Sequence, residues 1–493
     1  MKKRALTGIV VFCGVLAIVL GIAIVRAATL SSKQIAVAPV EVVVDADAAA
    51  RRLSQALQLA TISTQATPTD PAPFLALHEL LEQWYPRTHA ALEREVVSQM
   101  TLHYTWRGSD PQLKHVVVLA HIDVVPVEPG TEGQWTHPAF SGAIEGGYVW
   151  GRGALDNKQN ALGLMEATEI LLANGHTPRR TVHFVFGHDE EIGGEDGAGL
   201  VARRLQEQGV ELIAVFDEGL VITEGIVPGV GGPLALVGVA EKGYVSVELG
   251  AKSGGGHSSM PPGEDLSVIT LARALKRLHA EPMSASFDGP AALMFDHVAP
   301  EMDFGLKLVF ANRWLFGPLL LGQLEAKPST NALVRTTMAP TMLSASQKEN
   351  VLPQRSTAIL NFRVHPRDSI EDVLEYARQT IDDPRVDVEA VGRFRSAASP
   401  LASLDGFGYQ ALQRAIREVF PGVPVAPGMM LGATDSRHFL ALTPEVYRFG
   451  AATFRPEDLA RLHGTDERIA VVNYGQLIAF WTRLLANVDK EAF

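Results

Sequence analysis

The sequence predicts an α/β protein with a mostly parallel sheet, helices on both sheet faces, an inserted smaller α+β lid domain and an N-terminal transmembrane helix. Three observations lead to this prediction. Apolar strand-like runs alternate with helical runs from about residue 115 to residue 219, as they do in a parallel sheet. The alternation changes near Glu241 and resumes near residue 396. The third observation is a long uncharged run near the N-terminus.

The N-terminal run is a candidate membrane anchor. Residues 5–26 follow the basic sequence MKKR and carry no charge up to Val25, a length that crosses a bilayer as a helix. Because basic flanks stay in the cytoplasm, the rest of the chain is expected in the periplasm or the extracellular space. The alternative is a signal peptide cleaved at the small residues of VRAA, which would give a secreted protein. Residues 27–44 are expected to form a linker.

The first part of the catalytic domain is expected at residues 45–240. Apolar residues at helical spacing predict helices between Asp45 and Arg94. Strands and helices then alternate. The expected strands are HVVVLAHIDVVPV, RTVHFVFGHDEE and IAVFDEG, and the expected helices are NALGLMEATEILLANG and GAGLVARRLQEQG.

An inserted lid or dimerisation domain is expected at residues 241–395, and the catalytic domain resumes at residues 396–493. KGYVSVELGAK alternates as an edge or half-exposed strand would, and Ser369 with Asp372 forms a capping box that predicts a helix start. The apolar stretch at residues 283–324 has three interpretations. It could line a pocket for an acyl chain, pack a lid core or dimer interface, or lie against the membrane.

Charge and cysteine content narrow the possible functions. The formal net charge is −12, from 43 basic and 55 acidic residues, which argues against nucleic acid as the main partner. Cys13 is the only cysteine, so neither an internal disulfide nor a cysteine-based metal site can form. Any metal must therefore be held by histidine, aspartate and glutamate.

Residues that bind metals follow the predicted strands, and sites in an open α/β sheet form at the carboxyl ends of its strands. The first strand ends at His121 and Asp123, and Asp156 lies in a glycine-flanked turn before a helix. The next strands end in GHDEEIGG and FDEG, and RLHGTDE supplies His463. Such ligands suit Zn²⁺, and a pair of ions can lower the pKa of a water and polarise a carbonyl.

Two residue pairs have complementary roles in such a site. His121 and Asp123 are two residues apart in a strand and face the same side, so Asp123 can accept the second N–H of a metal-binding imidazole. The adjacent acids Glu190 and Glu191 can divide the work, one binding the metal and the other taking a proton from water.

Nine motifs in order resemble those of the zinc aminoacylase and carboxypeptidase S metallopeptidase family, including its N-fatty-acyl-amino-acid synthase/hydrolase branch. The resemblance extends from about Asp45 to the C-terminus. One departure is Ala433, where a second glycine is common in the family. The motifs are HIDVVP, QWTHPAFSG, GRGALDNK, GHDEEIGG, FDEG, KGY, GGGHSSMPP, NVLPQ and GATDSRHF.

The resemblance implies a site for two zinc ions. His121 would bind one ion, His463 the other, and Asp156 both. Glu218, next to Asp217, stays open as the alternative to it. The implied ligands are His121, Asp156, Glu191, Asp217 and His463.

The resemblance also implies catalytic roles for three residues. Glu190 would be the general base, and Asp123 would support His121. His257, in GGGHSSM, would stabilise the oxyanion, and in family dimers this histidine can reach the site from the neighbouring subunit.

Three further residues are candidates for substrate binding. Arg363 and Arg437 could each hold a substrate carboxylate through the guanidinium group, with structural or surface pairing as the alternative. Asn331 could polarise the substrate from the lid domain. His188 and Asp189 alternate away from the catalytic pair and are expected to be structural.

The sequence therefore predicts a membrane-anchored, extracytoplasmic two-zinc hydrolase. Its substrate would be an amide bond next to a free carboxylate, in a peptide C-terminus or an N-acyl amino acid. The same site run backwards would synthesise N-fatty-acyl amino acids. A non-catalytic binding protein that keeps the fold is disfavoured, because the base and all proposed ligands are present. A homodimer formed through the inserted domain is a possible assembly.

Overall fold

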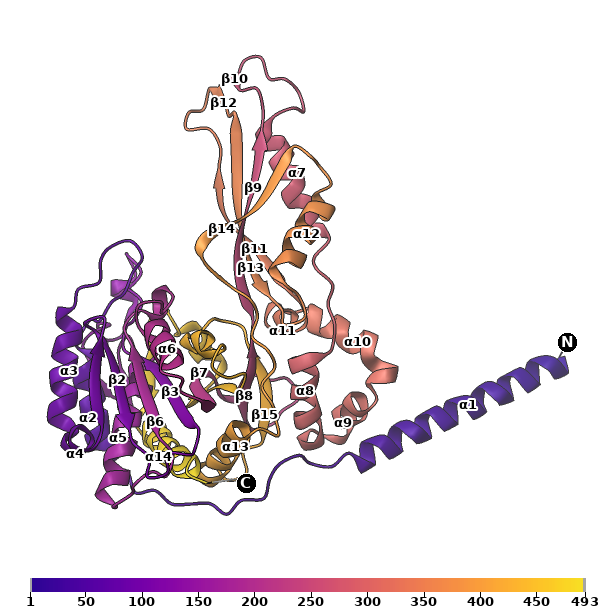
Figure 1. The fold of residues 1–493 in the computed structure, drawn as a ribbon. Coiled ribbons are helices and arrows are strands. Elements are labelled where there is room, and N and C mark those ends of the chain that lie inside the picture. Colours follow the sequence, from indigo (N-terminus) through magenta and orange to yellow (C-terminus); the bar gives the residue numbers. More distant parts are fainter. Residues whose placement is uncertain (1, 491–493) are drawn as a thin grey trace.

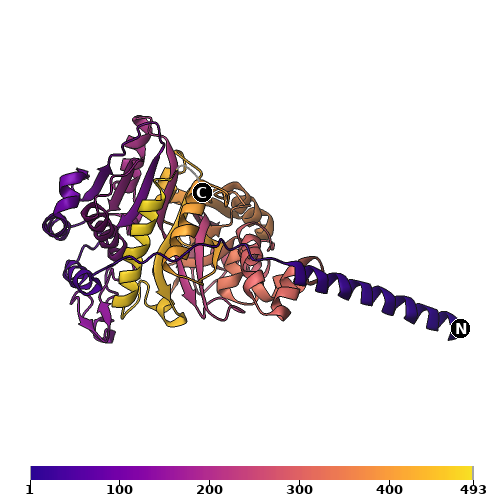
Figure 2. The same cartoon turned by 90° about the horizontal axis from the view of Figure 1, so that it is seen from below.

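The computed structural model describes residues 2–490 of the chain (Figure 1). Helix α1 (Lys2–Thr29) projects away from the rest of the molecule (Figures 1 and 2). Its segment Leu6–Thr29 is long and apolar enough to cross a membrane, and a signal sequence has the same properties. The expected apolar N-terminal helix is thus confirmed, while its role as anchor or signal stays a prediction.

The larger sheet has eight strands in the order β1-β2-β6-β3-β7-β16-β8-β15. The central strands β6, β3, β7 and β16 are mutually parallel, β2 runs antiparallel to β6, and β8 runs antiparallel to β7. This confirms the predicted mixed α/β fold with a largely parallel sheet. The strands are β1 (Glu93–Val97), β2 (Thr101–Trp106), β3 (His115–His121), β6 (Val182–Gly187), β7 (Leu212–Glu224), β8 (Pro233–Glu241), β15 (Val425–Met430) and β16 (Val446–Phe454).

Helices cover both faces of this sheet because its central strands are apolar on both sides. In β3, Val116 and Val118 belong to the large core on one face, whereas Val117 and Leu119 belong to a second core beneath α6. The large core lies under α2, α5, α13 and α14. The helices of this part are α2 (Ala46–Leu57), α3 (Ala72–Trp84), α4 (Pro86–Ala91), α5 (Lys158–Ala173), α6 (Ala198–Glu207), α13 (Phe407–Val419) and α14 (Val471–Asn487).

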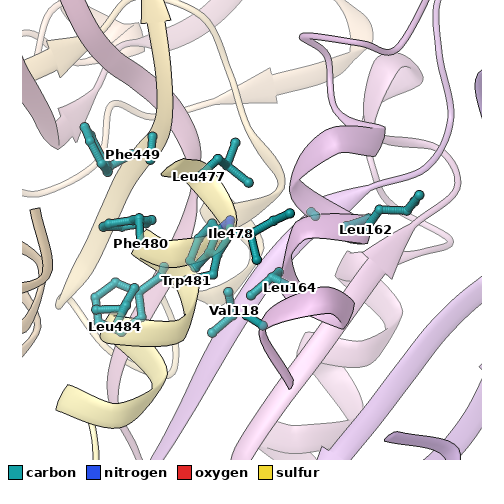
Figure 3. Packing of buried hydrophobic residues seen from close by; sticks show 14 of the residues in the cluster. Val118, Leu162, Leu164, Phe449, Leu477, Ile478, Phe480, Trp481 and Leu484 are labelled. Carbon is teal, nitrogen blue, oxygen red and sulfur yellow. The ribbon is translucent and has the colours of Figure 1, made fainter. Parts of the chain in front are cut away.

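The closing helix α14 packs tightly on α5, as Figure 3 shows around Trp481. A Cβ atom on Gly163 of α5 would lie 2.5 Å from Cδ2 of Leu477, so a larger residue here would force the Leu477 side chain to move. The Trp481 indole N–H donates to Oδ1 of Asn160, 3.2 Å away. These contacts hold α5 in place, and α5 begins at Lys158, two residues after Asp156.

A second, antiparallel sheet has the order β11-β13-β9-β14 and packs on α7 and α12. We call these elements the antiparallel lobe (residues 243–282 and 335–396). The capping box of Ser369 and Asp372 at α12 is confirmed. Strand β9 alternates buried and half-buried residues, as expected for a half-exposed strand. It lies between β13 and β14, so the alternative of an edge strand is wrong. The lobe contains β9 (Gly243–Lys252), α7 (Ser267–Ala280), β11 (Thr337–Ser344), β13 (Arg355–Val364), α12 (Ile370–Ile381) and β14 (Val386–Ser396).

The apolar stretch at residues 283–324 forms helices beside the edge of the larger sheet, where α8 lies against β15 (Figure 1). A separate apolar cluster joins them to Leu234 and Leu236 of β8. These helices are α8 (Gly289–Val298), α9 (Phe304–Ala311) and α10 (Arg313–Glu325), followed by α11 (Pro328–Val334). The remaining short strands are β4 (Ile144–Glu145), β5 (Tyr148–Trp150), β10 (Gly256–His257), β12 (Val351–Leu352) and β17 (Arg468–Ala470).

Candidate metal centre

Two groups of histidine and carboxylate side chains meet where the central strands end. In the first, His121 Nε2 lies 2.9 Å from Asp156 Oδ1 and 3.2 Å from Glu218 Oε1. In the second, His463 Nε2 lies 2.9 Å from Asp156 Oδ2 and 3.3 Å from Glu191 Oε2. Within each group the candidate ligand atoms lie within 4.8 Å of one another. Asp156 therefore offers one oxygen to each group, as a bridging carboxylate does.

The carboxylates at this site are buried and close together. Burial raises the pKa of Glu218 to about 8, and the charges of Asp156 and Asp217 add to the shift. Burial also raises the pKa of Glu191, whose Oε1 atom is enclosed without a hydrogen-bond partner among the described residues. Hydrogen bonds to Asp156 and Glu191 raise the pKa of His463 to about 10. Positive charge is thus favourable at this position, and the donor types fit divalent cations such as zinc.

Asp217 does not belong to either group. Its Oδ2 accepts a hydrogen bond from the backbone N–H of Ser436 at 2.8 Å, and its Oδ1 accepts one from the N–H of Glu218 at 2.8 Å. Adjacent residues in a strand point to opposite faces, so only one of this pair can face His121. The structure groups Glu218, the alternative left open by the sequence, with the candidate ligands, and places Asp217 outside both groups.

Asp123 connects His121 to the turn that carries Glu190 and Glu191. Its carboxylate accepts hydrogen bonds from the backbone N–H groups of Glu190 at 3.3 Å and Glu191 at 3.2 Å, and from the Ser63 hydroxyl. His121 Nδ1 lies 3.0 Å from the carbonyl oxygen of Asp123 and 3.3 Å from its Oδ1. Asp123 can therefore fix the orientation of the imidazole and the position of both acids.

Sequence reasoning missed a buried ion pair that joins the two loops of the site. Glu467 Oε1 accepts the backbone N–H groups of Gly153, Leu155 and Asp156 at 2.7–3.0 Å. Arg152 Nη1 donates to Glu467 Oε2 at 2.7 Å, and Arg152 Nη2 donates to the carbonyl oxygen of His463 at 3.1 Å. Arg152 lies in GRGALD and Glu467 in HGTDE, which are both motifs of the sequence analysis. Their pairing was not predictable because the two residues are far apart in the sequence.

Asp435 was also missed, although GATDSRHF contains it. Its carboxyl group is buried, and neither oxygen has a hydrogen-bond partner among the described residues. Burial raises the pKa of Asp435 well above its usual value. A Cβ atom on Gly194 would lie 1.8 Å from Asp435 Oδ1, so this glycine, just after the Glu190–Glu191 turn, has no room for a side chain.

A cavity of about 410 Å³ opens onto the two groups. Arg363 and Arg437 line it together with Glu190. The Arg363 guanidinium lies 4.9 Å from the ring centre of Tyr244, and that of Arg437 lies 4.6 Å from the ring centre of Phe394. Arg437 is further held by the carbonyl oxygens of Thr434 and Gly193. The apolar lining consists of Leu155, Ile192, Val221, Phe394, Met430, Phe454 and Leu462.

Two predicted site residues lie away from this cavity. His257 is exposed in β10, at the far tip of the antiparallel lobe (Figure 1), where its Nδ1 contacts the Ser259 hydroxyl at 2.8 Å. Asn331, in α11, is not among the residues that line the cavity, and neither is any residue of the stretch 283–324. A single chain in this conformation does not bring either side chain to Asp156.

His188 and Asp189 have structural contacts. His188 Nδ1 lies 2.6 Å from the Thr101 hydroxyl, and Asp189 Oδ2 accepts the backbone N–H of Asp196 at 2.8 Å. These contacts tie the start of the Glu190–Glu191 turn to β2 and to the loop before α6.

Comparison with solved structures places the fold among known hydrolases. A metallo-carboxypeptidase of the M20 family from Sulfolobus solfataricus superimposes with a TM-score of 0.66, over 90% of this chain and 99% of that one, at 19% identity. Human carnosine dipeptidase 1 gives a TM-score of 0.62 over 90% of this chain and 96% of that one, at 16% identity. At these identities the likeness concerns the fold alone.

Sequence comparison identifies much closer relatives. The N-fatty-acyl-amino acid synthase/hydrolase PM20D1 of Xenopus tropicalis is 41% identical over 89% of this chain and 85% of its own length. Carboxypeptidase S of Saccharomyces cerevisiae is 30% identical over 90% of this chain and 84% of its own length. The family model for Peptidase family M20/M25/M40 matches residues 117–487. The chain therefore belongs to the M20/M25/M40 peptidase family of metal-dependent hydrolases.

Proposed function

We propose that the protein is a membrane-anchored, extracytoplasmic hydrolase that uses two zinc ions to cleave an amide bond next to a free carboxylate. Its substrate would be a C-terminal peptide bond or an N-acyl amino acid. The observation that carries this proposal is the pair of histidine–carboxylate groups that share Asp156 and face a cavity containing two arginines.

The donor set supports zinc as the metal and two as the number of ions. Each group combines one imidazole with carboxylates, a combination that zinc accepts. His121, Asp156 and Glu218 would hold one ion, and Asp156, Glu191 and His463 the other. When bound, the two ions would supply Lewis acidity to the amide carbonyl and to the attacking water.

Glu190 is the proposed general base. It lines the cavity next to the candidate ligands but belongs to neither group, so its carboxylate stays available for proton transfer. It would accept a proton as the water oxygen bonds to the carbonyl carbon, then deliver it to the amide nitrogen as the C–N bond breaks. The products are a carboxylic acid and an amine.

Arg363 and Arg437 are the proposed anchors for the substrate carboxylate. Both guanidinium groups line the cavity beside Glu190, and among the described residues that of Arg363 has no hydrogen-bond partner. An arginine with free N–H groups can hold a carboxylate in two parallel hydrogen bonds. This position would place the adjacent amide bond toward Asp156.

His257 and Asn331 would contribute only through a different arrangement of the antiparallel lobe, the proposed lid. Movement of the lid would bring Asn331 nearer the cavity. A homodimer would supply His257 from the partner, and two features of the lobe support such a dimer. Strand β11 is an edge strand, and Met342 and Leu343 on it are exposed.

Reversible synthesis of N-fatty-acyl amino acids is the second candidate function. It is favoured by the relatives named for that activity and by the apolar lining of the cavity, which could hold an acyl chain. Because the same transition state serves both directions, hydrolysis and condensation use the same groups. Assays with dipeptides, and with N-oleoyl amino acids in both directions, separate the substrate classes.

A Glu190→Gln variant tests the proposed base. We expect the amidase rate to fall by about 10²–10⁴-fold, because the side chain can no longer accept a proton, while the zinc content stays at the parent level. Glu195→Gln, on an exposed acid of the same loop, is the matched control and should keep full activity. Parent-level amidase activity in Glu190→Gln would exclude Glu190 as the base.

A further inference from the structure

We propose that helices α9 and α10 form a second membrane contact, in which their exposed apolar side chains enter the outer leaflet beside the end of α1. This inference rests on the proposed role of α1 as a membrane anchor. It is independent of the chemistry at the metal centre.

Helices α9 and α10 are apolar, and nearly all of their residues are half-buried or exposed. The sequence of α9 is FGLKLVFA, and none of its residues is buried. Only Leu324 is buried in α10, and Trp314 and Leu319 are 53% and 61% exposed. An apolar surface of this kind on a soluble protein usually marks a binding face. The large exposed side chains are Phe304, Leu306, Trp314, Leu315 and Leu319.

The contact between α9 and α1 indicates what covers this surface. Helix α1 is exposed along most of its length, but Ala23 and Ala27 are buried where it meets α9. Asn312, directly after α9, donates from Nδ2 to the carbonyl oxygen of Ala23 at 2.9 Å. Ala23 lies inside the apolar segment Leu6–Thr29, so α9 contacts α1 within the proposed span.

The depth of this contact suits a helix that lies in the membrane interface. Ala23 precedes Thr29 by six residues, which at 1.5 Å per residue is about 9 Å along the helix. Interfacial helices bury their apolar face about 5–10 Å into the leaflet. If Thr29 marks the exit from the bilayer, α9 therefore lies at the depth of the upper acyl chains.

The shape of the pair favours entry into one leaflet over a second crossing. Helices α9 and α10 are long and apolar enough to cross a membrane only when taken together, and they bend by 105° at Asn312. A bend of that size turns the chain back toward the surface. Trp314 follows the bend, and tryptophan is enriched at the level of the head groups.

The second contact would fix the orientation of the catalytic sheet on the membrane. One anchor helix joined by a linker leaves a domain free to rotate, whereas α8 packs α9 and α10 onto β15 through the apolar cluster that includes Phe295. Amphiphilic substrates such as N-fatty-acyl amino acids concentrate in bilayers. An enzyme held at a fixed orientation there would meet them at their highest concentration.

Spin labelling of the full-length chain in phosphatidylcholine–phosphatidylglycerol vesicles tests the proposal. With the native cysteine replaced (Cys13→Ser), single cysteines are introduced as Leu16→Cys, Leu319→Cys and Met260→Cys. Met260 is the matched control, since it is 78% exposed and lies on the antiparallel lobe, away from α1. Collisions with oxygen report lipid, and collisions with a water-soluble nickel chelate report solvent.

The expected result is that labels at 16 and 319 collide mainly with oxygen, and the label at 260 mainly with the chelate. If the label at 16 collides mainly with oxygen but the label at 319 collides mainly with the chelate, the proposed second contact is wrong and the proposed anchor stands. If the label at 319 is protected from both reagents, then protein, such as a second copy of the chain, covers this surface. That result would also contradict the second membrane contact. If the label at 16 collides mainly with the chelate, both the proposed anchor and this inference are wrong. The proposed hydrolase activity is not affected by that result.

Fluorescence quenching of the chain with its native cysteine provides an independent test. Brominated lipids should quench the fluorescence of the parent chain more than that of a Trp314→Phe variant, because Trp314 lies in the leaflet. Equal fractional quenching in the two chains would contradict the proposal, even if a cysteine variant failed to fold.

Discussion

Asp156 is the residue on which the proposed centre depends most, because its two oxygens face different histidines. Oδ1 lies 2.9 Å from His121 Nε2, and Oδ2 lies 2.9 Å from His463 Nε2. Glu218 belongs only to the group of His121, and Glu191 belongs only to the group of His463. The proposed two-ion site therefore rests on the position of this single side chain between the two groups.

The assignment of Glu218 in place of Asp217 gives a test by metal content. Glu218→Gln removes a ligand atom beside His121 and should lower the zinc content from about two ions to about one per chain. Asp217→Asn keeps an oxygen that can accept a backbone N–H group and should retain both ions. Elemental analysis of the purified variants measures this. The reverse pattern would restore Asp217 as the ligand.

Glu467 should support both ions without touching either. In Glu467→Gln the buried guanidinium of Arg152 loses its charged partner, which we expect to cost about 3–5 kcal/mol of unfolding free energy. The loops of Asp156 and His463 should loosen, and zinc affinity should fall by about 10–100-fold. Urea unfolding and chelator competition measure the two effects. Glu457→Gln, on the exposed part of the same segment, is the control, and equal values in the two variants would contradict this role.

Residue types, strand ends and the family resemblance together predicted that His121, Asp123, Asp156, Glu191 and His463 lie close to one another. They could not decide between Asp217 and Glu218, because the choice depends on which face of β7 turns toward His121. They also could not predict the buried ion pair of Arg152 and Glu467, or the burial of Asp435. A buried charge is recognisable only when its partners, which are distant in sequence, are known.

At the scale of elements, a row of three histidines crosses β2, β6 and β3 in the larger sheet. His183 Nδ1 lies 3.0 Å from His103 Nε2, and His183 Nε2 lies 2.9 Å from His115 Nδ1. Burial and the neighbouring imidazoles lower the pKa of His183 to about 3, and burial also lowers the pKa values of His103 and His115. The sheet is therefore built around neutral imidazoles at this point.

This row predicts a loss of stability in acid. A histidine pKa of about 3 in the folded chain lies below the unfolded value of about 6.5. The unfolded chain then binds more protons, so the free energy of unfolding is highest above pH 6.5 and falls as the pH decreases toward 3. Between pH 7 and pH 5 the parent should lose more unfolding free energy in urea titrations than His183→Gln loses. His279→Gln, on an exposed position of α7, should match the parent, and an unchanged slope in His183→Gln would contradict the prediction.

The elements with a strong apolar periodicity were predictable from the sequence. The strands without a clear periodicity were not. Elements β3, α5, β6, α6 and β7 follow the sequence pattern. Strands β8, β15 and β16 contain glycine or proline and lack a clear alternation, so nothing local distinguishes them from loops. Strand β9 looks like an edge strand because one of its faces is half-exposed, but pairing on both sides depends on β13 and β14, far along the chain.

At the scale of the whole molecule, the described chain brings the proposed metal ligands together and leaves His257 and Asn331 outside the cavity. Sequence motifs predict which residues belong to a function, but they carry no information on the relative position of lobes or subunits. Contributions from His257 therefore require a partner or a movement of the antiparallel lobe. The sequence likewise does not decide whether α1 is a membrane anchor or a signal sequence, because that depends on surroundings outside the protein.

Anomalous X-ray diffraction at the zinc edge, from crystals of the zinc-loaded protein, tests the two-ion centre most directly. We expect two peaks about 3.5–4 Å apart. One should lie about 2.0–2.2 Å from atoms of His121, Asp156 and Glu218, and the other at the same distance from atoms of Asp156, Glu191 and His463. A single peak, or peaks away from Asp156, would contradict the two-ion centre.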